Sequence, residues 1–181
     1  MRDRHSAGFT LIELLIVVAI IGIIAAIAIP GLLRARIASN ESSAIASLRV
    51  IHNAQQTYHS ACGNGFYAST LPILGDAPLG GTPFVSPDLS AAASVDKSGY
   101  RFTMAEGDEA TSAVSDGCNP TGVAGALFSS YYATNNPLAV NVTGRRWFWT
   151  NTLGTIYTSD TDVFGGVTQG VGPPGAGAPI Q

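Results

Sequence analysis

Charged residues are scarce in this chain of 181 residues: they make up 12% of it, and the formal net charge is −3. So weak a charge creates no general attraction to nucleic acid or to anionic lipid, and we therefore expect no nucleic-acid partner. The scarcity is most pronounced between Leu14 and Leu33, where no residue is charged.

Local signatures of the common enzyme classes are missing as well. The sequence contains no phosphate-binding glycine loop, no nucleophile elbow and no cysteine–histidine pair with supporting spacing. We therefore expect neither enzymatic activity nor a cofactor.

What the chain does have is a long apolar run near its N-terminus. About 20 uncharged residues at 1.5 Å per residue form a helix of about 30 Å, the thickness of the hydrocarbon core of a bilayer. Arg2 and Arg4 precede the run and favour a cytoplasmic N-terminus, although three arginines follow it: Arg34, Arg36 and Arg49. The sequence therefore predicts one transmembrane segment, with the rest of the chain outside the cytoplasm.

The run differs from a secretory signal peptide. It is too long, and no convincing small-x-small cleavage site follows it. A junction between Gly8 and Phe9 lies in front of the run, and cleavage there would remove the basic leader and keep the apolar segment. Glu13 stands at the edge of that segment, where a carboxylate at membrane depth costs about 2.5–3.5 kcal/mol on insertion scales.

The stretch from Gly8 to Leu14, GFTLIEL, followed by an apolar run that contains Gly22 and Pro30, resembles the N-terminus of type IV pilins and pseudopilins. The resemblance implies that a prepilin peptidase cuts between Gly8 and Phe9 and methylates the new amine of Phe9. It also implies that Glu13 compensates the N-terminal ammonium of a neighbouring subunit during filament assembly.

The chemistry of these groups agrees with that implication. A free α-amine has a reference pKa of about 7.7–8.0 and exists at Phe9 only after cleavage. Breaking a buried amine–carboxylate pair costs on the order of 3–5 kcal/mol, which could enforce the register of subunits. Thr10 and Glu13 also fit a capping box, but the resemblance favours a helix that begins at Phe9.

The section from Gly22 to Pro30 is expected to be the weakest part of this helix. Gly22 lowers helix propensity by about 1 kcal/mol relative to alanine, and Pro30 has no N–H to donate to the carbonyl of Ala26. In the isolated subunit we expect a gently kinked but continuous helix. Whether the section melts in a filament stays open.

Downstream of Pro30 the pattern becomes amphipathic, and the helix is expected to end near Cys62 and Gly63. The apolar stripe contains Ile37, Ala44, Ile45, Leu48 and Ile51, followed by Gln55, and the other faces carry Ser39, Asn40, Glu41, Ser42 and Arg49. A short helical turn is expected at Leu89–Ala93. Strands are predicted at Tyr100–Met104, at Ala126–Thr134, and as a hairpin at Arg146–Thr150 and Thr155–Ser159.

The predicted fold class is therefore α+β, with one long N-terminal helix whose hydrophobic half projects and whose amphipathic half packs against a small antiparallel sheet, as in pilins. The expected organisation is a leader at residues 1–8, a transmembrane and assembly half of the helix at 9–33, a head at 34–164, and a flexible Gly- and Pro-rich tail at 165–181.

The two cysteines, Cys62 and Cys118, would lie in an oxidising compartment, so we predict a disulfide bond between them. Two free thiols are the alternative.

Other polar groups are expected to be structural. His52 and His59 share a helix face without a third metal ligand, so we predict a polar patch and no metal site. The acidic residues of 106–109 and 160–162 are expected in solvated turns, although carboxylates can bind calcium. Arg145 and Arg146 lie at the basic start of the predicted strand Arg146–Thr150 and are expected in solvent. Asn141 begins a possible glycosylation sequon.

The predicted function is that of a structural subunit of a type IV pilus-like filament that supports adhesion or motility. It would form a homopolymer with the help of prepilin peptidase and a pilus or type II secretion assembly machinery. The location would be the bacterial inner membrane before assembly and an extracellular filament afterwards. Alternatives are a periplasmic pseudopilin of a type II secretion system, a minor pilin, and a membrane-anchored binding domain that never polymerises.

Overall fold

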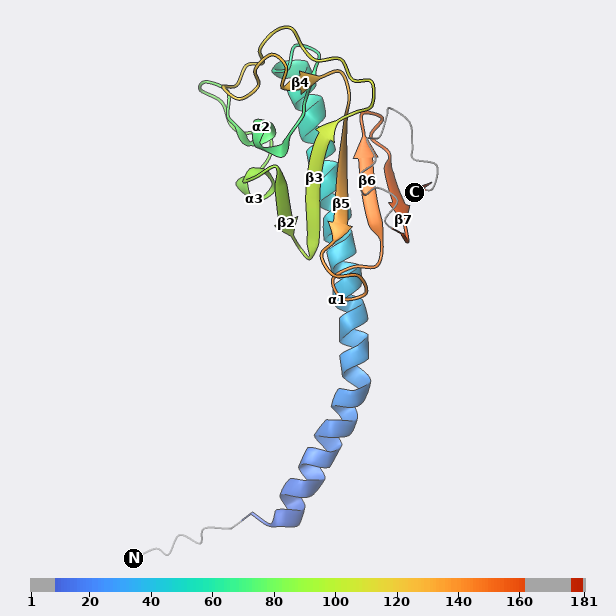
Figure 1. Ribbon diagram of the computed structural model, residues 1–181. Helices are drawn as coiled ribbons and strands as arrows, with labels where there is room; N and C mark the ends of the chain where they lie inside the picture. The colour runs from blue at the N-terminus through green and yellow to red at the C-terminus, as the bar shows by residue number, and fades with distance from the viewer. Residues whose placement is uncertain (1–8, 162–176, 181) are drawn as a thin grey trace, which may run out of the picture. The chain divides into compact units, whose positions relative to one another are not determined.

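The computed structural model describes residues 9–161 and 177–180 (Figure 1). The chain divides into two compact units, Met1–Arg36 and Ile37–Gln181, and we describe each by itself. The expected leader at residues 1–8 lies outside the described residues, and so does most of the expected tail.

Helix α1 (Leu11–Ala61) is 51 residues long and runs unbroken through both Gly22 and Pro30. In the first unit, every side chain of α1 from Leu11 to Arg36 is exposed except that of Ala25, which is half-buried. By length and composition this helix can cross a membrane.

In the second unit, one stripe of α1 is buried at helical spacing. It includes the predicted Ile37, Ala44, Leu48, Ile51 and Gln55, and it continues to Tyr58. Glu41 was expected on a polar face but is only 6% exposed, because it lies in the same stripe and binds Arg146. The stripe packs against the sheet, which crosses in front of α1 in Figure 1.

The α+β prediction is confirmed, since a long helix packs on an antiparallel sheet. Within the described residues the larger sheet has six strands, in the order β2 (Ser94–Lys97), β3 (Tyr100–Glu106), β5 (Tyr131–Pro137), β6 (Trp147–Asn151), β7 (Ile156–Ser159) and β8 (Ala178–Pro179). Every neighbouring pair is antiparallel. A smaller sheet pairs β1 (Tyr67–Ala68) with β4 (Leu127–Phe128).

The inward face of the larger sheet forms the core with α1. Along β3, the buried Tyr100, Phe102 and Met104 alternate with more exposed neighbours. This is the period of two that a sheet with one covered face requires. A second cluster of buried aromatic residues contains Trp147, Trp149 and Tyr157, and the rings of Trp149 and Tyr157 stack at a centroid distance of 4.6 Å.

Three details differ from the expectation. The predicted strand at Ala126–Thr134 is two strands, β4 and β5, which belong to different sheets. The expected turn at Leu89–Ala93 begins earlier, as α3 (Pro87–Ser90), because proline is favoured at the first position of a helix. Helix α2 (Leu71–Gly75) and strands β1 and β2 were not predicted, since elements this short carry little periodicity.

The end of the chain also differs from a tail without structure. Ala178–Pro179 pairs with β7, and the N–H of Ile180 donates to the carbonyl of Ile156 over 2.8 Å. The side chain of Ile180 packs against the core, which supplies the apolar contact that holds these residues on the sheet.

Candidate assembly site

The N-terminus of α1 is closed by a capping box. The hydroxyl of Thr10 donates to Oε2 of Glu13 over 3.1 Å and accepts the N–H of Glu13 over 3.3 Å, while the N–H of Thr10 donates to Glu13 Oε2 over 3.4 Å. The helix therefore begins at Leu11 and not at Phe9 as expected, because Thr10 acts as the N-cap. The capping box of Thr10 and Glu13 therefore determines where the helix begins.

The two residues expected to act in assembly are both accessible. Phe9 is 73% exposed, and Glu13 is exposed on the first turn of α1. A carboxylate near a helix N-terminus is favoured by the helix dipole, and an ammonium at Phe9 would add a full positive charge close by. The preceding Gly8 lies outside the described residues.

The helix that follows presents an extended apolar surface. Large aliphatic side chains are exposed all round it, from Leu11 at 81% to Ile29 at 64%. A helix that is hydrophobic on all sides belongs in lipid or among other helices. A Cβ added at Gly22 would meet no atom within 4 Å, so packing within the subunit does not require a glycine there.

Glu41 anchors the connection between β5 and β6 to α1, which the sequence analysis did not predict. Its Oε2 accepts from Arg146 Nε at 2.8 Å and Nη2 at 2.6 Å, and its Oε1 accepts the N–H of Arg145 at 3.0 Å. Asn40 Nδ2 donates to the carbonyl of Thr143 at 2.8 Å. Its helical spacing could have revealed this role. Glu41 lies four residues after Ile37 and three before Ala44, so it falls on the same helix face as the apolar stripe.

The far end of α1 is held by the predicted disulfide bond, which joins Cys62 to Cys118 with a Cα–Cα distance of 4.7 Å. Beside it, the Tyr58 hydroxyl donates to Asn119 Oδ1 at 2.9 Å. Burial, together with the nearby charge of Asp76, raises the pKa of Tyr58 to about 12, so this phenol stays a donor at physiological pH.

The two helix histidines have separate partners. His52 Nδ1 lies 2.8 Å from the hydroxyl of Tyr131, and burial lowers the pKa of His52 below its usual value. The ring of His59 stacks on Tyr67 at 4.5 Å between centroids. In the part of the chain that the structure describes, no three His, Cys, Asp or Glu side chains are grouped as metal ligands.

Most of the remaining candidates that the structure describes are exposed, and Arg146 is the exception. Asp108 and Glu109 are exposed in a turn, and Asp162 lies outside the described residues. Arg145 is exposed, whereas Arg146, expected in solvent, binds Glu41 and lies 5.3 Å from the centre of the Phe148 ring. Asn141 of the sequon is exposed at a φ of 62°.

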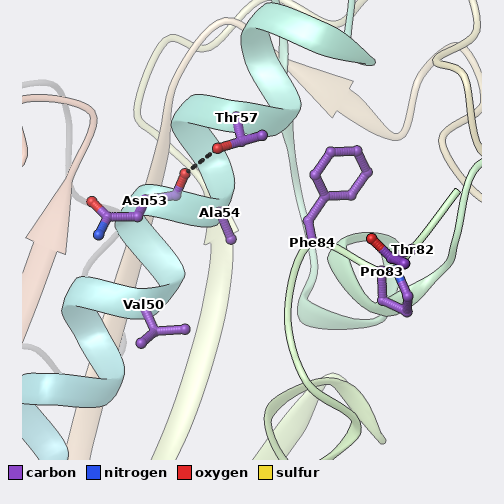
Figure 2. A pocket seen from close by; sticks show the side chains of 7 residues that line it. All are labelled: Val50, Asn53, Ala54, Thr57, Thr82, Pro83 and Phe84. Carbon is purple, nitrogen blue, oxygen red and sulfur yellow. Dashed lines mark hydrogen bonds between the residues drawn. The ribbon is translucent and has the colours of Figure 1, made fainter.

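An open pocket of about 410 Å³ lies between α1 and the segment 82–84 (Figure 2). Val50, Asn53 and Thr57 line it from the helix, and Phe84 lines it from the facing segment. The Thr57 hydroxyl donates to the carbonyl of Asn53. This hydrogen bond uses one of the few polar groups that line the pocket. None of the described residues that line the pocket is charged, so it offers no acid–base or metal chemistry.

Comparison with known proteins gives one family model and several relatives. A family model described as the prokaryotic N-terminal methylation motif matches residues 3–29. The type IV major pilin protein PilA of Myxococcus xanthus is 39% identical over 106 residues, which are 59% of this chain and 41% of that protein.

Two further relatives are shorter matches. The type IV wide pilus major component PilA4 of Thermus thermophilus is 44% identical over 80 residues, 44% of this chain and 60% of that protein. The type II secretion system core protein G of Aeromonas hydrophila is 31% identical over 58 residues, 32% of this chain and 41% of that protein. The matched regions thus span less than two thirds of each relative, and no solved structure gave a significant match.

Proposed function

Because this chain belongs to the family of type IV pilins and pseudopilins, we propose that it is a structural, non-enzymatic subunit of a type IV pilus-like filament that supports adhesion or motility. It is made as a prepilin in the inner membrane with its N-terminus in the cytoplasm. Prepilin peptidase cleaves it between Gly8 and Phe9 and methylates the amine of Phe9. The pilus assembly machinery then adds it to an extracellular filament.

One observation carries this proposal: the first half of α1 exposes an apolar surface on all sides, with Glu13 as the single charged group between Leu11 and Leu33. That surface suits two environments in succession, lipid before assembly and neighbouring helices afterwards. Both are apolar, so transfer between them changes the hydrophobic free energy little. Specificity must then come from packing and from the pairing of Glu13 with the Phe9 amine of another subunit.

We predict that Glu13→Gln leaves membrane insertion intact and strongly reduces the yield of sheared filaments. The amide keeps the shape of the side chain but leaves the Phe9 ammonium without its counter-charge, and removing one member of a buried ion pair costs on the order of 3–5 kcal/mol. Glu106→Gln, a change at an exposed glutamate of β3, is the matched control. A normal filament yield from Glu13→Gln would contradict the assigned role.

A pseudopilin of a type II secretion system is the second candidate, favoured by the similarity to core protein G of Aeromonas hydrophila. Such a subunit would be processed in the same way but would polymerise in the periplasm. A membrane-anchored binding domain that never polymerises ranks lower, because it gives Glu13 no charged partner.

N-terminal peptide mass spectrometry on two fractions, sheared surface filaments and washed inner membranes, tests the proposal. Abundant peptide that begins at methylated Phe9 in the sheared fraction is the expected result. The same processed end confined to the membrane would favour the pseudopilin or a minor subunit. An intact Met1 end in both fractions would contradict the proposed cleavage between Gly8 and Phe9.

A further inference from the structure

The connection between β5 and β6 carries aliphatic side chains on the surface of the head. In this segment, which we call the 138–144 loop, Leu138 is 46% exposed, Val140 50% and Val142 58%. Ala139 is exposed between them, and Arg145 is exposed directly after the loop. An exposed group of aliphatic residues next to a cation has the composition of a segment that lies in a membrane interface.

Five backbone N–H groups of this loop are already hydrogen-bonded within the protein. The N–H groups of Asn141, Val142 and Thr143 donate to the carbonyls of Gly144 and Ala139 over 2.8–3.1 Å. The N–H of Ala139 donates to the hydroxyl of Thr143 at 3.0 Å, and that of Leu138 donates to the carbonyl of Gly99 at 3.0 Å. Backbone groups that enter an apolar medium are costly unless they are paired, so these N–H groups can lose water at little cost while the exposed carbonyls stay at the wet level of the interface.

The loop is also rigidly attached to α1. Asn40 holds the carbonyl of Thr143, and the buried Glu41 holds Arg145 and Arg146. Gly144 packs so closely on Tyr100 that a Cβ at this position would overlap the tyrosine ring. The exposed aliphatic side chains therefore stand on a fixed base and do not belong to a free loop.

The attachment point is close in sequence to the apolar run. Asn40 follows Leu33 by seven positions in the sequence, which is about 10 Å along a helix and at most about 25 Å even for an extended chain. The headgroup layer adds about 5–8 Å to each side of the hydrocarbon core. This short link therefore allows the base of the 138–144 loop to approach the headgroups of the leaflet that contains Leu33.

We infer that the 138–144 loop is a second membrane contact of the unassembled subunit, in which Leu138, Val140 and Val142 enter the interface and Arg145 faces lipid phosphates. The inference rests on the proposed function, because it needs α1 to cross a bilayer. A second copy of the chain is the competing occupant of this surface. The bilayer is the better candidate for the occupant, since it is close to the loop of every inserted subunit, whatever the protein concentration.

Spin labelling of the full chain in vesicles of phosphatidylethanolamine and phosphatidylglycerol tests the inference. A nitroxide is attached to Val140→Cys with the native disulfide intact, and its collisions with oxygen, which concentrates in lipid, are compared with those of a water-soluble nickel chelate. Val114→Cys is the matched control, because Val114 is also an exposed valine, at 95%, but lies four residues before the Cys118 that binds the far end of α1. Ile20→Cys reports insertion of the apolar run.

At one subunit per vesicle, we expect the ratio of oxygen to nickel collisions to be several-fold higher at position 140 than at position 114, and highest at position 20. Equal ratios at 140 and 114 with a lipid value at 20 would overturn the loop contact and leave the proposed function standing. A high ratio at 140 that appears only in crowded vesicles would overturn it in favour of a second copy. An aqueous value at 20 would overturn the membrane stage of the proposed function, and the loop contact with it.

Discussion

Two buried asparagines in the head have opposite hydrogen-bonding environments. Asn119 donates to the carbonyls of Ile73 at 2.7 Å and Asp76 at 3.1 Å, and accepts from Tyr58. Asn135 is fully buried, and neither its amide nitrogen nor its oxygen has a partner among the described residues. A buried polar group without a partner costs about 1–3 kcal/mol, so one asparagine stabilises the head and the other weakens it.

We expect Asn135→Leu to raise the free energy of unfolding by about 1–2 kcal/mol, because it replaces an unpaired amide in an apolar environment with an apolar side chain of the same branching and heavy-atom number. Asn119→Leu is the matched control and should lower it by about 2–3 kcal/mol, since it leaves the Tyr58 hydroxyl and the Asp76 carbonyl unpaired. Guanidinium unfolding of the full chain in detergent, followed by tryptophan fluorescence, measures both. Equal destabilisation by the two variants would show that Asn135 has a partner, such as a buried water.

At the scale of elements, the two halves of α1 are stabilised by different interactions. Its second half depends on tertiary contacts, because only one stripe is apolar and that stripe is covered by the sheet. Its first half has no such cover within its own unit, and its stability comes from backbone hydrogen bonds and from an apolar medium. Gly22 and Pro30 both lie in that first half, where local weakness is not compensated by packing.

We therefore predict that the double variant Gly22→Ala, Pro30→Ala slows amide exchange of residues 22–30 in detergent micelles. Alanine is about 1 kcal/mol better than glycine in a helix, and alanine at position 30 restores the hydrogen bond to the carbonyl of Ala26. Exchange of residues 44–58, which the sheet covers, should not change. Unaltered exchange at 22–30 would show that this section is already as stable as the rest of the helix.

At the scale of the whole molecule, the disulfide bond closes a covalent loop in the head, with a sequence separation of 56. It ties the end of α1 to the connection between β3 and β4, which the structure describes in full and which contains no helix or strand. A constraint of this length acts mainly by restricting the unfolded chain.

Replacing both cysteines, Cys62→Ser with Cys118→Ser, should lower the free energy of unfolding by about 4 kcal/mol in the chain-entropy model. Guanidinium unfolding of the variant and of the unaltered protein under oxidising conditions measures the difference. Addition of a reductant should shift the unaltered protein to the midpoint of the variant and leave the variant unchanged. Coincident midpoints in oxidised and reduced protein would contradict a stabilising role.

The sequence by itself determined the features that depend on near neighbours in the chain. The apolar run, the stripe from Ile37 to Gln55 and the hairpin of β6 and β7 each follow from a local period or a turn signal. The motif from Gly8 to Leu14 indicated the family for the same reason, since it is contiguous.

Tertiary structure decided what depends on residues far apart in the chain. The sequence predicted Glu41 on a polar face of the helix. The fold brings Arg146, which is 105 residues later in the sequence, into contact with it. The split of β4 from β5, the addition of β8 to the sheet and the rigid base of the 138–144 loop have the same origin. A local pattern cannot reveal such pairs, because closing a long loop costs conformational entropy that only the assembled core offsets.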